Sequence, residues 1–323
     1  MKIISRVQYI SLFTMVCLNN LFSQPLPSED ESIPFVVTFS KGASLKYGDD
    51  DFTQTFFFVI PENTAKPFFI RIFDPETSGK HDEIYGPTNS KTRFSVYGGK
   101  GAFTEKDAQN ENPKGNFKSG VSLASKIFEG GTQFEDTWYV MGPFNPKEGE
   151  IRPNEPGYVF KLVIEGLEGD DGNLFKLFFS SEQNSNVKVE GANSFCYEYT
   201  FRLSDIVKSV SHIYPFVPKG VVGCKVSVFD YDDAGLIRVV SIAKKGEIFT
   251  SGTEGEWSLI EFPIVEEEIN TSIDIQFINQ KAVKNNNVAV YIKNQYGELM
   301  PFYTAPIGGV PKYKYKIGVK PKN

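Results

Sequence analysis

The chain has 323 residues, with 34 basic and 40 acidic side chains, and its formal net charge at pH 7 is −6. A surface with this charge balance repels nucleic acid and anionic lipid, so no nucleic-acid partner is expected. The chain has only 2 histidines and neither a Cys-x-x-Cys nor a His-Glu-x-x-His motif, which argues against classical zinc chemistry. Its length exceeds what one hydrophobic core usually serves, so two domains are expected.

The N-terminus has the pattern of a secretory signal peptide. Lys2 and Arg6 supply a positive start, an apolar run extends from Tyr9 to Leu18, and Leu21–Ser23 is a candidate cleavage site. We therefore expect residues 1–23 to be removed and the protein to be exported, as a periplasmic, outer-membrane-associated or extracellular protein. The apolar run is roughly half the length that a membrane-spanning helix needs, so no membrane-spanning segment is expected.

Short runs of β-branched and aromatic residues, separated by Gly, Asn, Asp and Pro, dominate the rest of the chain and predict an all-β fold. In chain order, the clearest predicted strands are Phe56–Ile60, Phe68–Phe73, Arg93–Tyr97, Tyr158–Ile164, Leu174–Phe179, Cys224–Phe229, Leu236–Ile242, Ser272–Ile278 and Val288–Ile292. The Asp-Gly turn within Glu168–Asn173 lies between two of these runs and predicts a β-hairpin.

We expect two tandem antiparallel β-sandwiches, of the jelly-roll or immunoglobulin-like type, over residues 30–200 and 215–310. Residues 201–214 form the predicted connector, which is helical or extended. Apolar residues spaced to suit one helical face, from Ser204 as N-cap to Ile213, favour a helix. Residues 100–133 are rich in Gly, Lys, Asn and Glu and predict a long excursion from the first sandwich.

The last residues of the sequence, 311–323, alternate lysine with apolar residues. This alternation predicts a basic C-terminal tail or an edge strand whose lysines discourage edge-to-edge pairing.

Acidic residues gather in turns between the predicted strands. The stretch from Gly48 to Phe52 contains Asp49-Asp50-Asp51 and leads to the aromatic run Phe56–Pro61 and then to Phe69–Asp74. This stretch resembles the bacterial pre-peptidase C-terminal type of β-sandwich, which runs from an Asp-bearing turn to an aromatic strand, a Pro-containing turn and a second apolar strand. The resemblance implies a small accessory module, and some relatives of that family bind calcium or polysaccharide.

Calcium takes about six to eight oxygen ligands, and carboxylates at strand ends can supply them. Because the resemblance pairs the two acidic turns, we expect Asp49, Asp51 and Asp74 to bind calcium. Ordinary solvated acidic turns are the alternative.

Aromatic side chains offer a candidate binding surface, because sugar rings stack on exposed aromatic faces while nearby carboxylates accept hydrogen bonds from their hydroxyls. Trp138 and Tyr139 follow Glu135-Asp136, and Trp257 follows Glu256. These three aromatics are the candidate ligand-binding residues, and burial in a sandwich core is the alternative.

No catalytic motif stands out in the sequence. A Gly-x-Ser-x-Gly elbow is absent, and His81 and His212 have no nucleophile marked beside them. We therefore expect a non-enzymatic protein that binds carbohydrate or a surface partner protein, or that builds the cell envelope. A carboxylate-based glycoside hydrolase is the alternative, since its two carboxylates would meet only in the fold.

Removal of the signal peptide would leave Cys196 and Cys224. Export places them in an oxidising compartment, where we predict that they form a disulfide. Free buried thiols are the alternative.

Overall fold

The computed structural model describes residues 25–111, 116–152, 157–231, 235–250 and 255–308. The strands are β1 (Pro25–Leu26), β2 (Phe35–Phe39), β3 (Thr53–Ile60), β4 (Phe68–Phe73), β5 (Lys91–Gly98), β6 (Val121–Glu129), β7 (Trp138–Phe144), β8 (Glu150–Ile151), β9 (Tyr158–Glu168), β10 (Gly172–Ser180), β11 (Asn193–Cys196), β12 (Glu198–Arg202), β13 (Val210–Ile213), β14 (Gly223–Phe229), β15 (Gly235–Val240), β16 (Lys245–Thr250), β17 (Trp257–Pro263), β18 (Asp274–Asn279), β19 (Asn287–Asn294) and β20 (Phe302–Tyr303). Short 3-10 helices are η1 (Glu29–Glu31), η2 (Leu45–Tyr47), η3 (Lys106–Gln109), η4 (Asn116–Lys118), η5 (Pro146–Glu148) and η6 (Glu266–Glu268). These ranges contain no α-helix, which confirms the predicted all-β class.

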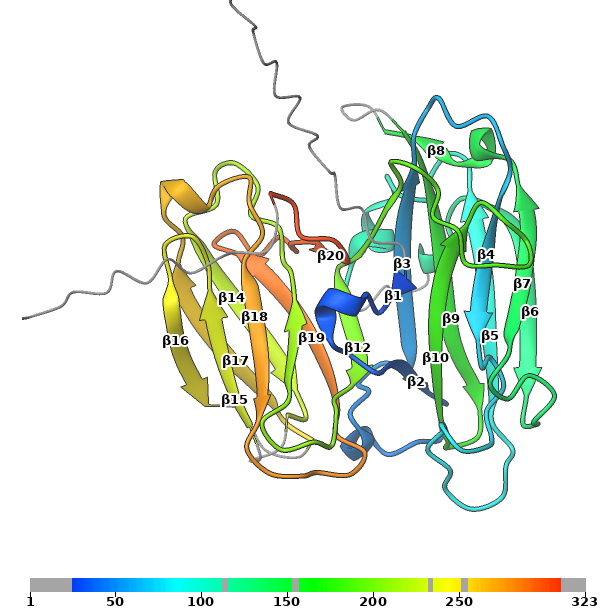
Figure 1. The fold of residues 1–323 in the computed structure, drawn as a ribbon, viewed down its shortest axis with the longest axis horizontal. Coiled ribbons are helices and arrows are strands. Elements are labelled where there is room, and N and C mark those ends of the chain that lie inside the picture. Colours follow the sequence, from blue (N-terminus) through cyan, green and yellow to red (C-terminus); the bar gives the residue numbers. More distant parts are fainter. Residues whose placement is uncertain (1–24, 112–115, 153–156, 232–234, 251–254, 309–323) are drawn as a thin grey trace, which may run out of the picture.

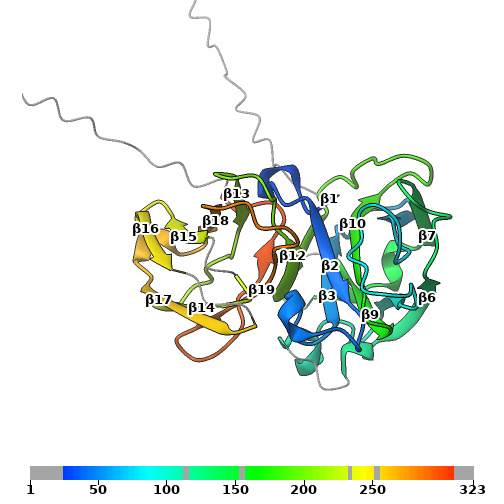
Figure 2. The same ribbon diagram turned by 90° about the horizontal axis from the view of Figure 1, so that it is seen from below.

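The strands form three antiparallel sheets. A 9-stranded sheet has the order β17-β14-β19-β12-β2-β10-β4-β7, with β1 also paired to β10. A 7-stranded sheet has the order β20-β11-β3-β9-β5-β6, with β8 paired to β9, and a 4-stranded sheet has the order β13-β18-β15-β16. Figure 1 shows two β bodies side by side, and the end-on view of Figure 2 places β12 and β2 where the bodies meet. The 9-stranded sheet therefore runs through both bodies.

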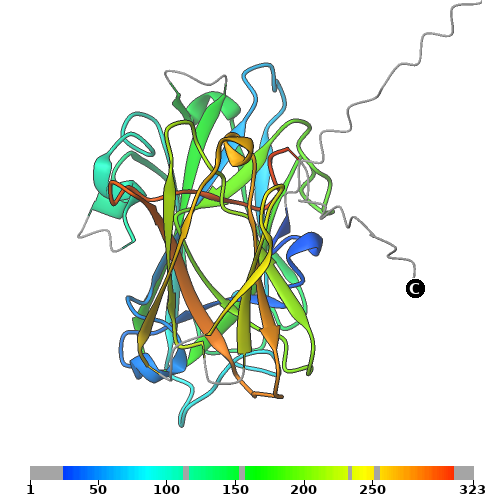
Figure 3. The ribbon, with the colours of Figure 1, turned by 90° about the vertical axis from the view of Figure 1, so that its left-hand side faces the viewer.

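Aromatic contacts show how the sheets are layered. In the first body, Phe58 on β3 lies 4.1 Å from Phe179 on β10, measured between ring centroids, and this contact joins the 7-stranded to the 9-stranded sheet. In the second body, Phe201 on β12 lies 5.6 Å from Phe277 on β18, which joins the 9-stranded to the 4-stranded sheet. Figure 3 shows two layers of strands in the nearer body. This layering is consistent with β-sandwich domains.

Strand pairing links the two predicted domains. β12 pairs with β2 through Phe201↔Val36 and Arg202↔Phe35, and with β19 on its other side. β20, near the C-terminal end of the described chain, pairs with β11. The two halves thus share sheets, and the limits of the two domains stay predictions.

Of the two forms predicted for the connector, helical or extended, the helical one is wrong. A turn follows Ser204, and Val210–Ile213 is β13, which pairs with β18. Ile206 is 66% exposed and Val207 is 46% exposed. The spacing suited one helical face, but no element in the described ranges covers these two side chains, and Val210–Ile213 pairs with β18 instead.

The predicted hairpin at Glu168–Asn173 is also wrong. The strands that flank this turn, β9 and β10, belong to different sheets, so the turn carries the chain from one layer to the other. Asp171 holds the crossing, since its carboxylate accepts hydrogen bonds from Ser90 Oγ at 2.8 Å and from the Tyr85 N–H at 2.7 Å. Both strands are buried along most of their length, so their sequences carry no sign of which sheet each one joins.

The predicted excursion at residues 100–133 is partly a strand. Val121–Glu129 is β6, which pairs with β5 at the edge of the 7-stranded sheet. Phe128 is buried, whereas Val121 is 57% exposed and Ile127 is 44% exposed. An edge strand with so little burial has no clear apolar alternation.

The signal peptide at residues 1–23 and the tail at residues 311–323 lie outside the described residues, so both stay predictions. None of the helices in the described ranges has the length and apolar character needed to cross a membrane.

Candidate functional site

The outer face of the 9-stranded sheet carries a row of aromatic and cationic side chains. Trp138 on β7 pairs with Phe73 on β4, which in turn pairs with Lys176 on β10. The Trp138 and Phe73 ring centroids are 5.4 Å apart. Lys176 Nζ lies 5.8 Å from the Phe73 ring centroid and 4.6 Å from that of Phe35 on β2. Since alternate residues of a strand face opposite sides, the other face of these strands supplies the core, for example Ile72.

A groove of about 730 Å³ lies beside this row. The side chains that line it come from the segment before β2, from β7 and β10, and from the loop after β10: Pro25, Pro27, Ser28, Glu29, Asp30, Ser32, Ile33, Trp138, Lys176, Leu177, Phe178, Asn186 and Lys188. The groove therefore combines apolar surface with ammonium, amide, hydroxyl and carboxylate groups. A volume of this size is within the range of small-molecule sites.

Buried polar contacts hold Trp138 in place. The Arg71 guanidinium lies 5.2 Å from the Trp138 ring centroid and donates a hydrogen bond to the Asn186 side-chain carbonyl. Arg71 is only 7% exposed, and burial lowers the pKa of its guanidinium. Burial also lowers the pKa of Lys176. The groove thus presents a half-buried indole, which Arg71 contacts, beside the Asn186 amide and the ammonium groups of Lys176 and Lys188.

The three predicted ligand-binding aromatics do not form one site. Tyr139 faces the core side of β7, with its ring 4.9 Å from that of Phe128 and 5.4 Å from that of Phe134. Trp257 is 39% exposed on β17, which is the opposite edge of the 9-stranded sheet from β7. Of the three, only Trp138 lines the groove.

The predicted calcium ligands do not come together either. Asp49, Asp50 and Asp51 form one group whose ligand-type atoms lie within 4.8 Å of one another, whereas Asp74 belongs to a second group with His81 and Glu135. The first turn follows β2 and Asp74 follows β4, and β10 lies between those strands in the sheet. A site shared by Asp49, Asp51 and Asp74 is therefore wrong, and calcium at Asp49–Asp51 alone stays a prediction.

The carboxylate of Asp49 accepts hydrogen bonds from backbone N–H groups. Its Oδ2 accepts from the Phe39 N–H and its Oδ1 from the Phe52 N–H, each at 2.9 Å. Asp51 Oδ1 accepts from the Thr53 N–H, also at 2.9 Å. Burial raises the pKa of Asp49 to about 7, although these backbone hydrogen bonds lower it. The turn between β2 and β3 is therefore held by its own acidic side chains.

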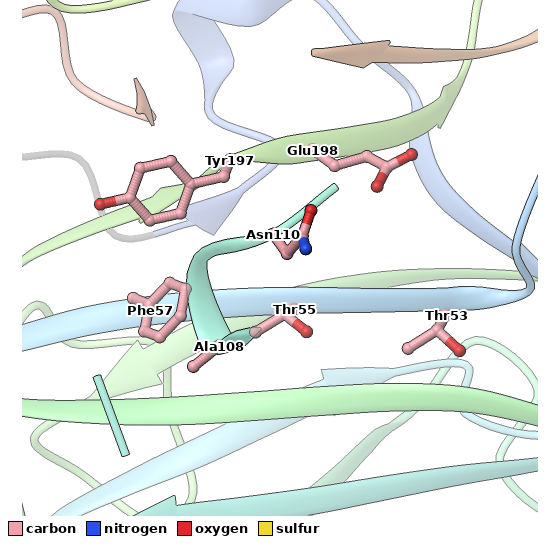
Figure 4. Close-up of a pocket in the computed structure, with 7 residues that line it drawn as sticks. All are labelled: Thr53, Thr55, Phe57, Ala108, Asn110, Tyr197 and Glu198. Carbon is pink, nitrogen blue, oxygen red and sulfur yellow. The ribbon is translucent and has the colours of Figure 1, made fainter. Parts of the chain in front are cut away.

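A small cavity lies next to this turn. It has a volume of about 10 Å³ and is lined by Thr53, Thr55, Phe57, Ala108, Asn110, Tyr197 and Glu198 (Figure 4). Such a volume holds about one water molecule and excludes a sugar. Burial raises the pKa of Glu198 well above its usual value, and the neighbouring carboxylates Asp51 and Asp50 raise it further.

The predicted disulfide is wrong. Cys196 and Cys224 are both free and buried. Cys196 lies on β11 of the 7-stranded sheet and Cys224 on β14 of the 9-stranded sheet, where its Sγ is 3.5 Å from Met300 Sδ. Burial raises the pKa of Cys224 to about 12 and that of Cys196 well above its usual value, so both thiols are expected to be unreactive.

Sequence reasoning identified Trp138 but missed Arg71, Lys176 and Asn186. A signal for Arg71 was present, since it is the polar residue in the middle of the predicted strand Phe68–Phe73 and must face away from Ile70 and Ile72. Asn186 carried no such signal, because its contact with Arg71 spans 115 residues.

The chain matches no protein-family model and no curated protein. Among solved structures it is similar to that of Broad Bean Stain Virus, with 8% identity over 95% of this chain and 98% of that chain and a TM-score of 0.21. The structure of infectious bursal disease virus Gx strain has 10% identity over 83% of this chain and 73% of that chain, with a TM-score of 0.15. The N-terminal CBM22-1-CBM22-2 tandem domain of Xyn10C from Paenibacillus barcinonensis has 9% identity over 77% of this chain and 78% of that chain, with a TM-score of 0.14. At these TM-scores the likeness carries no argument about function.

Proposed function

We propose that this protein is an exported, non-enzymatic carbohydrate-binding protein whose site is the groove beside Trp138. The observation that carries the proposal is the half-buried indole of Trp138, held by Arg71 in a groove of about 730 Å³. A sugar ring that stacks on this indole comes within reach of the Asn186 amide and the Lys176 ammonium, which line the same groove. An apolar platform with a few fixed polar groups is the usual design of a sugar site.

The carboxylates of the groove favour binding over hydrolysis. A glycosidase places two carboxyl groups on either side of the scissile bond, roughly 5 to 9.5 Å apart. Among the described residues that line the groove, the carboxylates are Glu29 and Asp30, neighbours on η1. Residues of the same short turn approach a bound sugar from one side. The polar groups that β10 and its following loop contribute to the groove are Lys176, Lys188 and Asn186, none of which is a carboxylate.

The proposal is tested by titrating the mature chain against a panel of neutral and acidic polysaccharides by isothermal calorimetry. For a polysaccharide that binds, Trp138→Ala is expected to weaken binding about 30-fold, which corresponds to the roughly 2 kcal/mol of a central aromatic contact. Trp257→Ala is the matched control, since it removes a partly exposed tryptophan from the opposite edge of the same sheet. Equal affinity of Trp138→Ala and the unmutated chain, or release of reducing sugar during the titration, would contradict the proposal.

A further inference from the structure

Asp74 is a buried carboxylate that accepts no hydrogen bond from the described residues. It directly follows β4, is 1% exposed and has a left-handed backbone with φ 54°. Both of its carboxylate oxygens are buried, and neither has a hydrogen-bond partner among the residues that the structure describes. A buried carboxylate is costly unless it is paired, hydrogen-bonded or bound to a metal, so its environment requires an explanation. Burial, reinforced by the nearby Glu135 carboxylate, raises the pKa of Asp74 to about 7.

Glu135 approaches Asp74 from the segment between β6 and β7. Its Oε1 accepts from the Lys80 N–H at 3.3 Å, whereas its Oε2 is buried and has no hydrogen-bond partner in the described part of the chain. Gly79 makes this approach possible, because a Cβ added there would lie 1.5 Å from Glu135 Oε2. The backbone at φ +103° also favours glycine at this position. Three carboxylate oxygens from Asp74 and Glu135 thus remain buried and unsatisfied.

His81 completes the group. Its ring packs 4.9 Å from the Phe35 ring, and its Nε2 lies 2.8 Å from Asp136 Oδ1. When Nε2 carries the proton and donates to Asp136, Nδ1 keeps a lone pair for a metal. A carboxylate behind a histidine in this way is the usual support of a metal-bound imidazole. Ligand-type atoms of Asp74, His81 and Glu135 all lie within 4.8 Å of one another.

We propose that Asp74, His81 and Glu135 bind a first-row divalent transition metal, for which Zn²⁺ is the best match. The donor set is one imidazole nitrogen with two carboxylates, whereas calcium sites are built from oxygen ligands alone. The metal would tie together three segments: the end of β4, the loop before β5 and the segment before β7. Its positive charge would also offset two carboxylates that otherwise repel each other.

The experiment uses the mature chain after treatment with a chelator. Zn²⁺, Ca²⁺ and Mg²⁺ are added separately, and the melting temperature and the calorimetric stoichiometry are measured. The expected result is one Zn²⁺ per chain, a melting temperature that rises with Zn²⁺ and returns with chelator, and a smaller response to Ca²⁺ and Mg²⁺. Co²⁺ is expected to give visible absorption bands from nitrogen and oxygen ligands.

Asp74→Asn is the decisive variant, because asparagine tolerates the left-handed backbone and removes only the charge. It is expected to lose the Zn²⁺ response while the metal-free chain keeps or gains stability. His81→Gln changes a side chain that is 23% exposed and is expected to weaken Zn²⁺ binding at least about 10-fold even if Asp74→Asn fails to fold. Asp51→Asn is the control, since it alters the other acidic group, and it is expected to keep the response.

Two outcomes would overturn the metal site. The first is an unmutated chain whose melting temperature does not respond to Zn²⁺ more than to Ca²⁺ and Mg²⁺. The second is a His81→Gln variant that binds Zn²⁺ as tightly as the unmutated chain.

Discussion

Raising the pH through neutrality is expected to destabilise the folded chain through Glu31. This side chain ends η1, is 1% exposed and accepts a hydrogen bond from the Ser28 N–H at 2.6 Å. Burial raises its pKa from the ordinary value of 4.5 to about 8, although the Ser28 hydrogen bonds lower it. The folded chain therefore holds the Glu31 proton more tightly than the unfolded chain does.

The sign and the size of the effect follow from this difference in proton binding. The contribution of Glu31 to the free energy of unfolding is fully present below pH 4.5 and is lost as the pH rises through about 8. Each pKa unit corresponds to about 1.36 kcal/mol, so the loss relative to low pH reaches about 3 kcal/mol at about pH 7 and about 5 kcal/mol once the pH is well above the folded-state pKa.

Urea unfolding of the unmutated chain and of Glu31→Gln, at about pH 5, 7 and 9, measures this loss. Glutamine keeps the shape of the side chain without a charge, so the stability of the variant relative to the unmutated chain is expected to grow by about 2 to 3 kcal/mol between about pH 5 and 7 and by about 4 kcal/mol between about pH 5 and 9. Glu29→Gln is the matched control, since Glu29 lies on the same turn and is exposed. A difference between Glu31→Gln and the unmutated chain that stays constant from about pH 5 to 9 would refute the reasoning.

Three other predictions concern buried and acidic groups. Lys244 and Glu268 form an ion pair, 6% and 0% exposed, with Nζ 2.7 Å from Oε2. Lys244→Met is expected to lower the free energy of unfolding in urea by about 3 to 5 kcal/mol, because it leaves the buried glutamate without its counter-charge. Adding Glu268→Leu is expected to restore most of this stability, and a double variant that recovers none would contradict the prediction. Cys196 and Cys224 are both expected to react with a thiol reagent in unreduced, denatured mature protein. Cysteines that do not react would instead support a disulfide between them. If Asp49–Asp51 binds calcium, millimolar calcium raises the melting temperature of the unmutated chain but not of a variant with asparagine at all three positions. A melting temperature of the unmutated chain that does not change with calcium would mean that these residues form an ordinary solvated turn.

The sequence by itself was enough to predict the local elements. The predicted strand Phe68–Phe73 has the same bounds as β4, and the aromatic run Phe56–Ile60 lies within β3. Each is a short apolar run between turn residues, and this pattern depends only on neighbours along the chain. Trp138 and Asp74 were also recognisable as candidates, because an aromatic residue beside carboxylates and a carboxylate at a strand end are local features.

Only the tertiary structure decided what these elements meet. The Asp-Gly turn before β10 was visible in the sequence, but its role in joining two sheets depends on strands far from it in the chain. The same holds for the groove, where Asn186 reaches Arg71, and for the second acidic group, where His81 and Glu135 reach Asp74 from separate loops. Antiparallel pairing and layer packing bring together residues whose separation in sequence is arbitrary, so spacing along the chain carries no record of these contacts.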